Sequence, residues 1–465
     1  MTAIIRPRRH DIRPLVLAAS FLASAATLGA QTLRSPFLGS VKAASVTDAS
    51  LTLSLTDAID RGLQYNLGLI EASTAGAAAR AARLRALSAL LPTVSATAAK
   101  VYEQASLREV GLTLPGLPPT TGGFTFEDVR LHVTQSVYSG ELRNRYRAES
   151  AGDRASALNV RDARDEVVFV VGRAFLQIVD SAARLDTATA QLASAVELVR
   201  LAADRVHAEV APEIDALRAQ VERQSAEQRV VMARNDFEKD RAALARIIGL
   251  PVDQRFSVDA TLPVRALGFA NEADASASAL RQRADLAGAK AAAEAAGLTV
   301  RARRAQAHPS VGISADYGGG GDRVHFNQVY TVVAGVTLPL YTGGRIAADI
   351  AEADSSWQRR RAESDDLEAQ VVYEVHVAWL DLSAAESTVT VARSNRDLAN
   401  RALAQSQDRY ANGVTTYLEV VQAQELVVRA DESLIVSVHD LNLARLALAR
   451  AAGTAEVSAK EWFAQ

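Results

Sequence analysis

One uninterrupted segment limits the folds open to this chain. Residues 141–205 contain no proline, and only Gly152 and Gly172 interrupt their helix-forming sequence. At ~1.5 Å per residue, a helix of roughly 65 residues is about 100 Å long. No compact domain can contain such a helix, so the sequence predicts an extended helical structure.

Apolar residues inside and beyond this segment follow the spacing of coiled coils. Alternating intervals of four and three residues separate Leu192, Val196, Val199, Ala203 and Val206. A seven-residue interval separates Val420, Val427, Leu434, Leu441 and Leu448. Aromatic residues make up only 5% of the chain, a composition that favours long, closely packed helices over aromatic-centred cores.

The chain contains one structural unit twice. Asp204-Arg205 recurs as Asp408-Arg409 at an offset of 204 residues, and residues 138–140 (YSG) match residues 341–343 (YTG) at 203. Each unit is predicted to run helix, strand pair, long helix, tight turn, helix. The predicted boundaries are 51–250 and 274–453 for the repeats, 93–102, 124–138, 310–318 and 329–341 for the strands, 206–214 and 410–418 for the hairpin tips, 251–273 for a linker and 454–465 for a tail.

The predicted strands have one apolar and one polar face. Val129, Leu131 and Val133 alternate with Arg130 and His132. Each stretch has about the 9–11 residues that a tilted strand needs to cross a bilayer in a barrel. A soluble hairpin that packs its apolar face on a helix would show the same alternation, and the strands alone do not separate the two interpretations.

The N-terminus predicts export. Residues 1–30 contain four arginines, then an apolar run from position 15 to about 28, the layout of a secretory signal peptide. A transmembrane anchor is the alternative, although the run is shorter than the ~20 residues that a spanning helix needs. No later segment is apolar over such a length, so a membrane-embedded mature protein would have to cross the bilayer as strands.

Several function classes are disfavoured. The chain has no cysteine, which excludes disulfides, thiol catalysis and a lipid anchor on an N-terminal cysteine. Its net charge of −3, or −6 without residues 1–30, gives no support for nucleic-acid binding. The seven histidines are scattered, and neither a phosphate loop nor an HExxH motif occurs. We therefore expect no catalytic residues, no metal site and no cofactor.

The ordered set of motifs resembles the outer membrane efflux protein (TolC) family over about residues 51–453. The resemblance is carried by LSLTDAI at 53–59, QSVYSG at 135–140, LPLYTGG at 338–344 and RYANGVT at 409–415. It implies a mainly α chain with a transmembrane β-barrel in the outer membrane. Three chains would contribute four strands each to a 12-stranded barrel, continued by an α-helical coiled-coil tunnel through the periplasm. Its implied partners are outer-membrane lipid, a periplasmic adaptor (membrane fusion protein) and an inner-membrane transporter.

The resemblance also assigns residues at the hairpin tips. Glu419 matches a family position with an acidic residue at the periplasmic entrance, whereas Gln422 stands where a second acid is usual. Tyr410 and Asp215 match positions that link the two hairpins and hold the entrance closed, although Thr415 replaces an arginine of some members. The adaptor would dock on Val210, Ala211, Asn412, Gly413 and Val414. All of these residues could instead belong to solvated, capped helical turns.

Three functions remain open from the sequence. The first is the exit duct of a tripartite efflux system that exports small molecules or drugs. The second is the outer-membrane component of a type I protein secretion system. The third, from another class, is a periplasmic coiled-coil scaffold without a channel.

Overall fold

The computed structural model describes residues 35–41, 51–107, 109, 111, 115, 116, 118–259, 268–321 and 326–458. Residues 36–465 form one unit, separate from residues 1–35. The predicted signal peptide, residues 1–30, lies outside the described residues, as do parts of the predicted linker and tail.

The same order of elements occurs twice along the chain. The first set is α1 (Leu55–Tyr65), α2 (Leu67–Ser88), β2 (Thr93–Glu103), β3 (Phe124–Tyr138), α3 (Gly140–His207) and α4 (Glu213–Ile247). The second is α5 (Glu272–Gln282), α6 (Ala284–Ala305), β5 (Ser310–Gly321), β6 (Phe326–Thr337), α7 (Arg345–Ala411) and α8 (Tyr417–Ala451). A short helix, η1 (Pro36–Leu38), and two short strands, β1 (Leu51–Leu53) and β4 (Phe256–Val258), complete the described elements.

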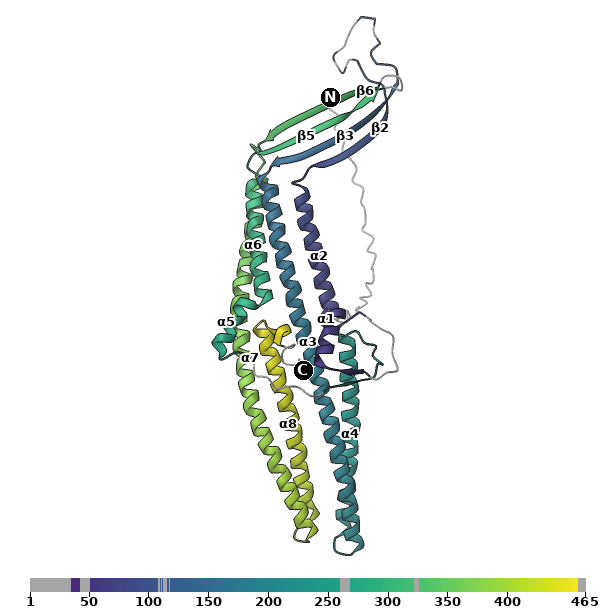
Figure 1. The fold of residues 1–465 in the computed structure, drawn as a ribbon, viewed down its shortest axis with the longest axis vertical. Helices are drawn as coiled ribbons and strands as arrows, with labels where there is room; N and C mark the ends of the chain where they lie inside the picture. Colours follow the sequence, from purple (N-terminus) through teal and green to yellow (C-terminus); the bar gives the residue numbers. More distant parts are fainter. Residues whose placement is uncertain are drawn as a thin grey trace, which may run out of the picture. The chain divides into compact units, whose positions relative to one another are not determined.

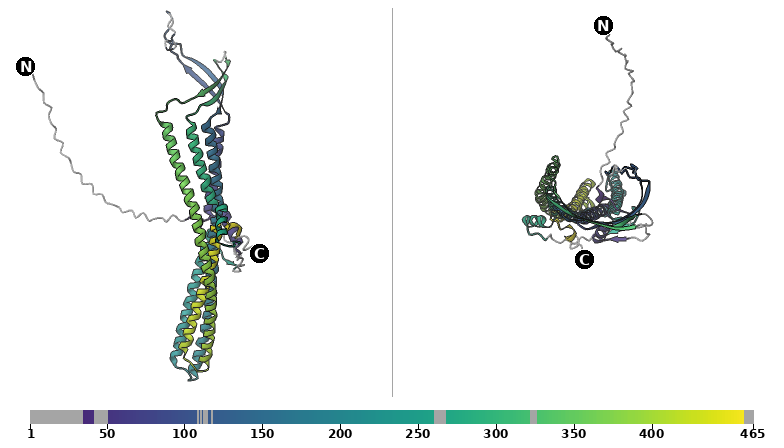
Figure 2. Two further views of the ribbon diagram at one scale, coloured as in Figure 1. Left: turned by 90° about the vertical axis from the view of Figure 1, so that its left-hand side faces the viewer. Right: turned by 90° about the horizontal axis from the view of Figure 1, so that it is seen from above.

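The long helices α3 and α7 are the frame of a helical wall (Figure 1). They contain 68 and 67 residues, whereas α2, α4, α6 and α8 are much shorter. Near the strands α3 lies between α2 and α6, and near the hairpin tips it lies between α4 and α8, with α7 beside α6 and then α8. Two short helices stacked end to end therefore cover each side of α3. Figure 2 shows that the wall is curved.

The four long strands form one antiparallel sheet in the order β2-β3-β5-β6. Its register places Leu131, Tyr317 and Tyr330 side by side on one face, and His132, Asp316 and Thr331 side by side on the other. The predicted alternation therefore holds across three strands. No helix of the described residues is both long and apolar enough to cross a bilayer.

Each repeat has a helix break that the sequence pattern did not predict. The helix expected at the start of the first repeat is interrupted at Asn66, whose backbone is extended. The side chain of Asn66 accepts a hydrogen bond from the Gly68 amide and donates one to the Phe37 carbonyl at 2.7 Å. Arg283, 217 residues later, makes the equivalent break between α5 and α6. A buried polar side chain replaces the missing helical hydrogen bonds at Asn66.

Arg283 also joins three helices electrostatically. Its side chain is only 6% exposed and forms ion pairs with Asp285 at 2.6 Å and with Glu374 of α7. Gly453, just after α8, packs so closely on the Arg283 backbone that an added Cβ would lie 2.9 Å from its nitrogen. Burial would raise the pKa of Asp285, but the hydrogen bond and charge of Arg283 outweigh it and hold that pKa below its usual value.

Replacement of Arg283 tests this junction. In Arg283→Met the carboxylates of Asp285 and Glu374 lose their cation in a partly buried site, so we expect a loss of about 2–3 kcal/mol in the free energy of unfolding. Urea denaturation followed by circular dichroism measures it. Arg281→Met, at an exposed position of the same helix pair, is the control and should change stability by less than about 0.5 kcal/mol. Equal losses in both variants would contradict the role of Arg283.

Candidate functional site at the hairpin tips

Both helical hairpins end in the same backbone turn. The Val210 amide donates to the Arg205 carbonyl and the Glu209 amide to the Val206 carbonyl, each at 3.0 Å. The second tip repeats this pair, from Val414 to Arg409 and from Gly413 to Tyr410. These are the two hydrogen bonds of a Schellman motif, which closes a helix through one residue in the left-handed conformation.

The residue in that conformation differs between the tips. Gly413 has φ of 73°, which costs a glycine nothing, whereas Glu209 has φ of 56°. For a residue with a Cβ, the left-handed conformation costs roughly 1–2 kcal/mol. The first tip is therefore strained and the second is not.

Two tyrosines join the two hairpins just above the turns. Tyr410 at the end of α7 and Tyr417 at the start of α8 are 2% and 0% exposed, and their rings meet edge to face with centroids 5.5 Å apart. Around them pack residues of α3 and α4 from the first hairpin, including Leu198, Ala202 and Ala219. The tyrosines therefore form the apolar contact between the two repeats at this end.

Arg205 of α3 reaches across to the second hairpin. Its guanidinium carbon lies 4.6 Å from the centre of the Tyr410 ring, and its Nη1 donates a hydrogen bond of 2.9 Å to the Ala411 carbonyl. That carbonyl belongs to the last turn of α7, where a cation also interacts favourably with the helix dipole. Arg205 thus makes both a cation–π contact and a charged hydrogen bond between the hairpins.

Asp215 of α4 lies near the tyrosines but is not bonded to them. It is 4% exposed, and its nearest described cation is Arg218, 3.8 Å away on the same helix. Burial, and then the charge of Asp215, raise the pKa of Tyr410, and Arg205 partly opposes this shift. Burial raises the pKa of Tyr417 to about 12, with smaller contributions from Glu222, Tyr410 and Asp215. Neither hydroxyl donates to a carboxylate of the described residues.

Glu419 is held inside the second tip. One of its carboxylate oxygens lies 3.4 Å from Arg409 Nε, and the other accepts a hydrogen bond from the Thr415 hydroxyl. The side chain is half-exposed, and Gln422, one turn later on α8, is exposed. Thr415, at a position where some family members carry an arginine, therefore serves as a hydrogen-bond donor to Glu419.

The residues expected to dock an adaptor lie on both turns. Val210 and Val414 are the most exposed apolar residues of the two tips, Asn412 and Gly413 are exposed, and Ala211 is half-buried. Asn412 also donates to the Asp408 carbonyl at 2.8 Å, which caps the end of α7. The structure thus brings these five residues to one end of the helical wall.

Three residues of this site were missed by the sequence interpretation: Arg205, Arg409 and Tyr417. Arg205 and Arg409 occupy equivalent positions of the two repeats, so the repeat itself was a signal. They act differently, because Arg205 contacts the other hairpin whereas Arg409 contacts its own. Tyr417 had no such signal, since Glu213 occupies its place in the first repeat.

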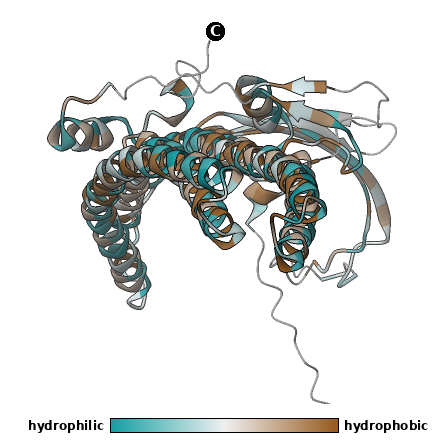
Figure 3. Cartoon of the chain, turned by 90° about the horizontal axis from the view of Figure 1, so that it is seen from below, coloured by the Kyte–Doolittle hydropathy of each residue, from teal (hydrophilic) through white to brown (hydrophobic). Residues whose placement is uncertain are grey.

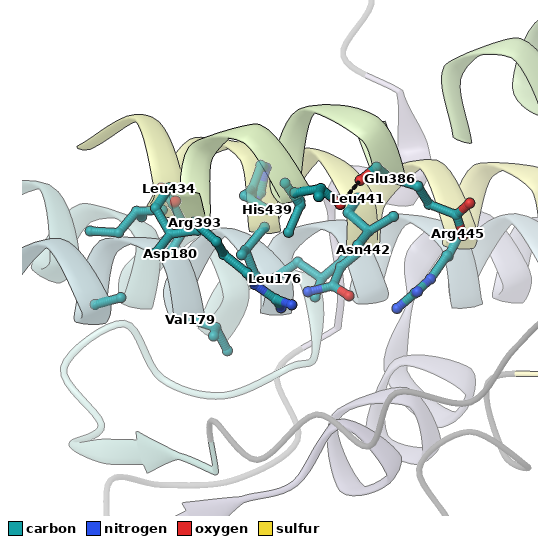
Figure 4. A pocket seen from close by; sticks show the side chains of 15 residues that line it. Leu176, Val179, Asp180, Glu386, Arg393, Leu434, His439, Leu441, Asn442 and Arg445 are labelled. Atoms are coloured by element: carbon teal, nitrogen blue, oxygen red, sulfur yellow. Dashed lines mark hydrogen bonds between the residues drawn. The ribbon is translucent and has the colours of Figure 1, made fainter. Parts of the chain in front are cut away.

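A groove between the hairpins is the other candidate site (Figure 4). Its volume is about 470 Å³, and side chains of α3, α7 and α8 line it, among them Asp180, Glu386, Arg393, His439, Asn442 and Arg445. Acids and bases alternate along this groove without converging on one point. Across the described residues, no three His, Cys, Asp or Glu side chains gather closely enough to hold a metal ion.

Sequence comparison relates the chain to membrane export proteins. It is 27% identical over 346 residues to the outer membrane efflux protein BepC of Brucella suis, a match covering 73% of this chain and 74% of BepC. It is 22% identical over 323 residues to the alkaline protease secretion protein AprF of Pseudomonas aeruginosa, covering 67% and 66% of the two chains.

Structural comparison confirms the predicted TolC-like fold. The crystal structure of the Campylobacter jejuni CmeC outer membrane channel superposes with a TM-score of 0.77 over 92% of this chain and 95% of that one, at 16% identity. The sequence profile of the outer membrane efflux proteins matches residues 58–250 and 275–454, one segment for each repeat. The chain is therefore a member of the outer membrane efflux protein family.

Proposed function

We propose that this chain is one subunit of a homotrimeric exit duct in the outer membrane, through which small molecules leave a tripartite efflux system. The observation that carries this proposal is a sheet with two free edges that continues into a curved helical wall. Neither sheet nor wall is complete in one chain. A periplasmic adaptor and an inner-membrane transporter supply the remaining parts of the system.

The sheet requires further strands and an apolar surrounding. The outer strands β2 and β6 each have one edge without a partner among the described strands. Large apolar side chains are exposed along one face, with Tyr330 78% exposed and Val336 70%. Unpaired backbone groups are tolerated in lipid only when a barrel closes. Four strands from each of three chains meet that requirement.

The helical wall has apolar edges as well. Exposed apolar residues of α7 occur at positions 373, 380, 391 and 398, intervals of seven and eleven that keep them on one side of the helix. At the opposite edge, α4 exposes Ile214, Leu217 and Val221 at intervals of three and four. Packing of α7 from one copy on α4 of the next would bury both rows and close a tunnel.

The tips would then surround the periplasmic entrance. Three copies of Glu419 would place negative charge around the opening, and Arg205, Tyr410 and Tyr417 would hold each pair of hairpins together in the closed state. A ring of carboxylates raises the local concentration of cations. Gln422 contributes no second ring. The exposed residues of the two turns are the surface for the adaptor.

Protein secretion is the second candidate, because the similarity to the Pseudomonas aeruginosa secretion protein AprF covers two thirds of this chain. The duct itself is passive in both cases, so the inner-membrane partner selects the substrate. Expression in two strains, one lacking its efflux duct and one lacking its secretion duct, separates the candidates by which defect is restored.

Conductance measurements test the channel. The detergent-purified protein should form stable pores in planar bilayers, and Glu419→Ala should make them less cation-selective because the ring of negative charge is lost. Glu425→Ala on the same helix, whose carboxylate pairs with Arg429, is the control and should leave selectivity unchanged. Protein that stays in solution without detergent and never conducts would support a scaffold and exclude the duct.

Arg205→Ala tests the contact between the hairpins. Loss of the cation–π contact and of the hydrogen bond to Ala411 should favour the open state by about 1–2 kcal/mol, roughly a tenfold rise in the ratio of open to closed channels. Single-channel recording measures this ratio. Arg200→Ala, which removes pairs only with Glu197 and Asp204 of the same helix, should leave it unchanged. Equal effects of the two variants would argue against the contact.

Alkaline titration tests the packing of Tyr417. A tyrosine freed from this site ionises near pH 10, whereas in the closed tip the pKa of Tyr417 is about 12. Below pH 10 the phenol is neutral in both states, and as pH rises from 10 through 12 the closed state loses stability. The difference in tyrosinate absorbance between wild type and Tyr417→Phe should therefore rise near pH 12. A rise near pH 10 would show that Tyr417 is not buried.

A further inference from the structure

Arginines are concentrated where the helices meet the sheet. The eleven helical residues nearest to the strands in each case, 78–88 of α2, 140–150 of α3, 295–305 of α6 and 345–355 of α7, contain ten arginines and five acidic residues. Their net charge is +5, in a chain whose total charge is −3. A surplus of this size within about two to three helical turns of the sheet calls for a negatively charged partner.

Carboxylates of the chain pair with only some of these arginines. Arg83 pairs with Asp153 and Arg345 with Asp349, each at 2.9 Å, and Arg154, farther from the sheet, pairs with Glu294 at 2.8 Å. By contrast, Arg80, Arg143, Arg147 and Arg301 are exposed and form no ion pair within the described parts of the chain. We refer to these four residues as the arginine belt.

The arginine belt on α3 and α6 faces the outside of the wall. Arg143, Arg154 and Asp165 are spaced by eleven residues, three helical turns, and Arg147 is seven residues from Arg154, so all four share one face of α3. Asp165 accepts a hydrogen bond from the Glu456 amide beyond α8. The last described residues beyond α8 (yellow in Figure 2, right) lie on the convex side of the helical wall, whose curvature is also visible in Figure 3.

The same side is identified on α6. Glu294, the partner of Arg154, is seven residues from Arg301, so both lie on the outer face. Arg145 and Arg303 lie elsewhere, lining a cavity of about 240 Å³ between α3 and α6 together with Glu141 and Glu149. These two arginines are therefore not part of the belt.

Helix electrostatics explain only some of these arginines. Arg301 lies near the C-terminal end of α6, where a positive charge is favourable, whereas Arg80 is more than two turns from the end of α2. Arg143 is the fourth residue of α3, near the positive end of the helix dipole, where arginine is unfavourable. An anion outside the helix would offset this charge.

The neighbouring residues have the composition of a membrane interface. Leu340 and Tyr341, between β6 and α7, are each 90% exposed, and Leu91 and Tyr138 at the ends of the first strand pair are more than half exposed. Tyrosines at the border of an apolar sheet face mark the depth at which lipid headgroups lie. The belt begins within about 6–12 Å of that border, which is the reach of the headgroup layer and an arginine side chain.

We propose that the arginine belt binds the phosphate groups of anionic phospholipids in the periplasmic leaflet of the outer membrane. This inference rests on the proposed function, since it requires that the sheet lies in that membrane. Arginine binds phosphate through paired hydrogen bonds, and several arginines on one face can share a layer of headgroups. The bound lipids would fix the depth of the barrel and neutralise the unfavourable charge at the start of α3.

Lipid retention tests the belt. The purified protein is reconstituted in vesicles of equal parts phosphatidylcholine and phosphatidylglycerol, extracted again in mild detergent, and analysed for bound lipid by mass spectrometry. The wild type should retain phosphatidylglycerol preferentially. In the triple variant Arg143→Gln, Arg147→Gln and Arg301→Gln, this preference should fall at least about fivefold, which corresponds to about 1 kcal/mol for a single arginine at an anionic surface.

Two further variants control for charge and folding. The triple lysine variant at the same positions keeps the charge and should retain most of the preference. Arg234→Gln, Arg246→Gln and Arg281→Gln together remove three exposed arginines far from the sheet and should leave the preference unchanged. Equal losses in the belt variant and this control would overturn the proposal.

The behaviour of the wild type distinguishes a failure of the proposed lipid binding from a failure of the proposed exit duct. If the wild type inserts and conducts but retains both lipids equally, the proposed lipid binding by the arginine belt is wrong, whereas the proposed exit duct is still supported. If it neither inserts nor conducts, the proposed duct and the belt both fail.

Discussion

A helix of 68 residues has to be covered along its whole length, and this requirement organises the rest of the chain. Among the described helices, α2 and α4 lie end to end on one side of α3, and α6 and α8 lie end to end on the other, so helix ends and joints collect halfway along the wall. Asn66 and Arg283 lie at these joints. The Asn66 side chain accepts from the Gly68 amide, which the interrupted helix leaves without a helical partner, whereas the Arg283 side chain pairs with the carboxylates of Asp285 and Glu374.

The helices and strands could be predicted from the sequence because their hydrophobic residues recur at regular intervals. The alternating pattern around Val129 predicted strands over 93–102 and 124–138, and the structure has β2 over Thr93–Glu103 and β3 over Phe124–Tyr138. The helix breaks at Asn66 and Arg283 could not be predicted from the sequence. Each depends on a bond to a distant segment, to Phe37 in one case and to Glu374 in the other, and no local pattern reports such a bond.

The candidate site also has residues that the sequence predicted and contacts that it did not predict. Resemblance of short motifs predicted Glu419, Tyr410 and Asp215 as site residues. In the structure the contacts that join the hairpins are made by Tyr410, Tyr417 and Arg205. Arg205 and Ala411 are 206 positions apart, and their hydrogen bond exists only because the repeats lie side by side. The equivalence of Arg205 and Arg409 in the two repeats could have identified both positions from the sequence. It could not have predicted that the two arginines contact different partners.

The two turns of the tips share their hydrogen bonds but differ at the residue with positive φ, which is Glu209 in one and Gly413 in the other. In a trimer of such chains, six turns would form a rim with nearly sixfold backbone symmetry. The charged and strained turn would alternate with the neutral, relaxed one, so the chemical symmetry of the rim is only threefold. A partner ring of six identical subunits would therefore meet two kinds of contact in alternation, and its neighbouring subunits would bind with unequal affinity.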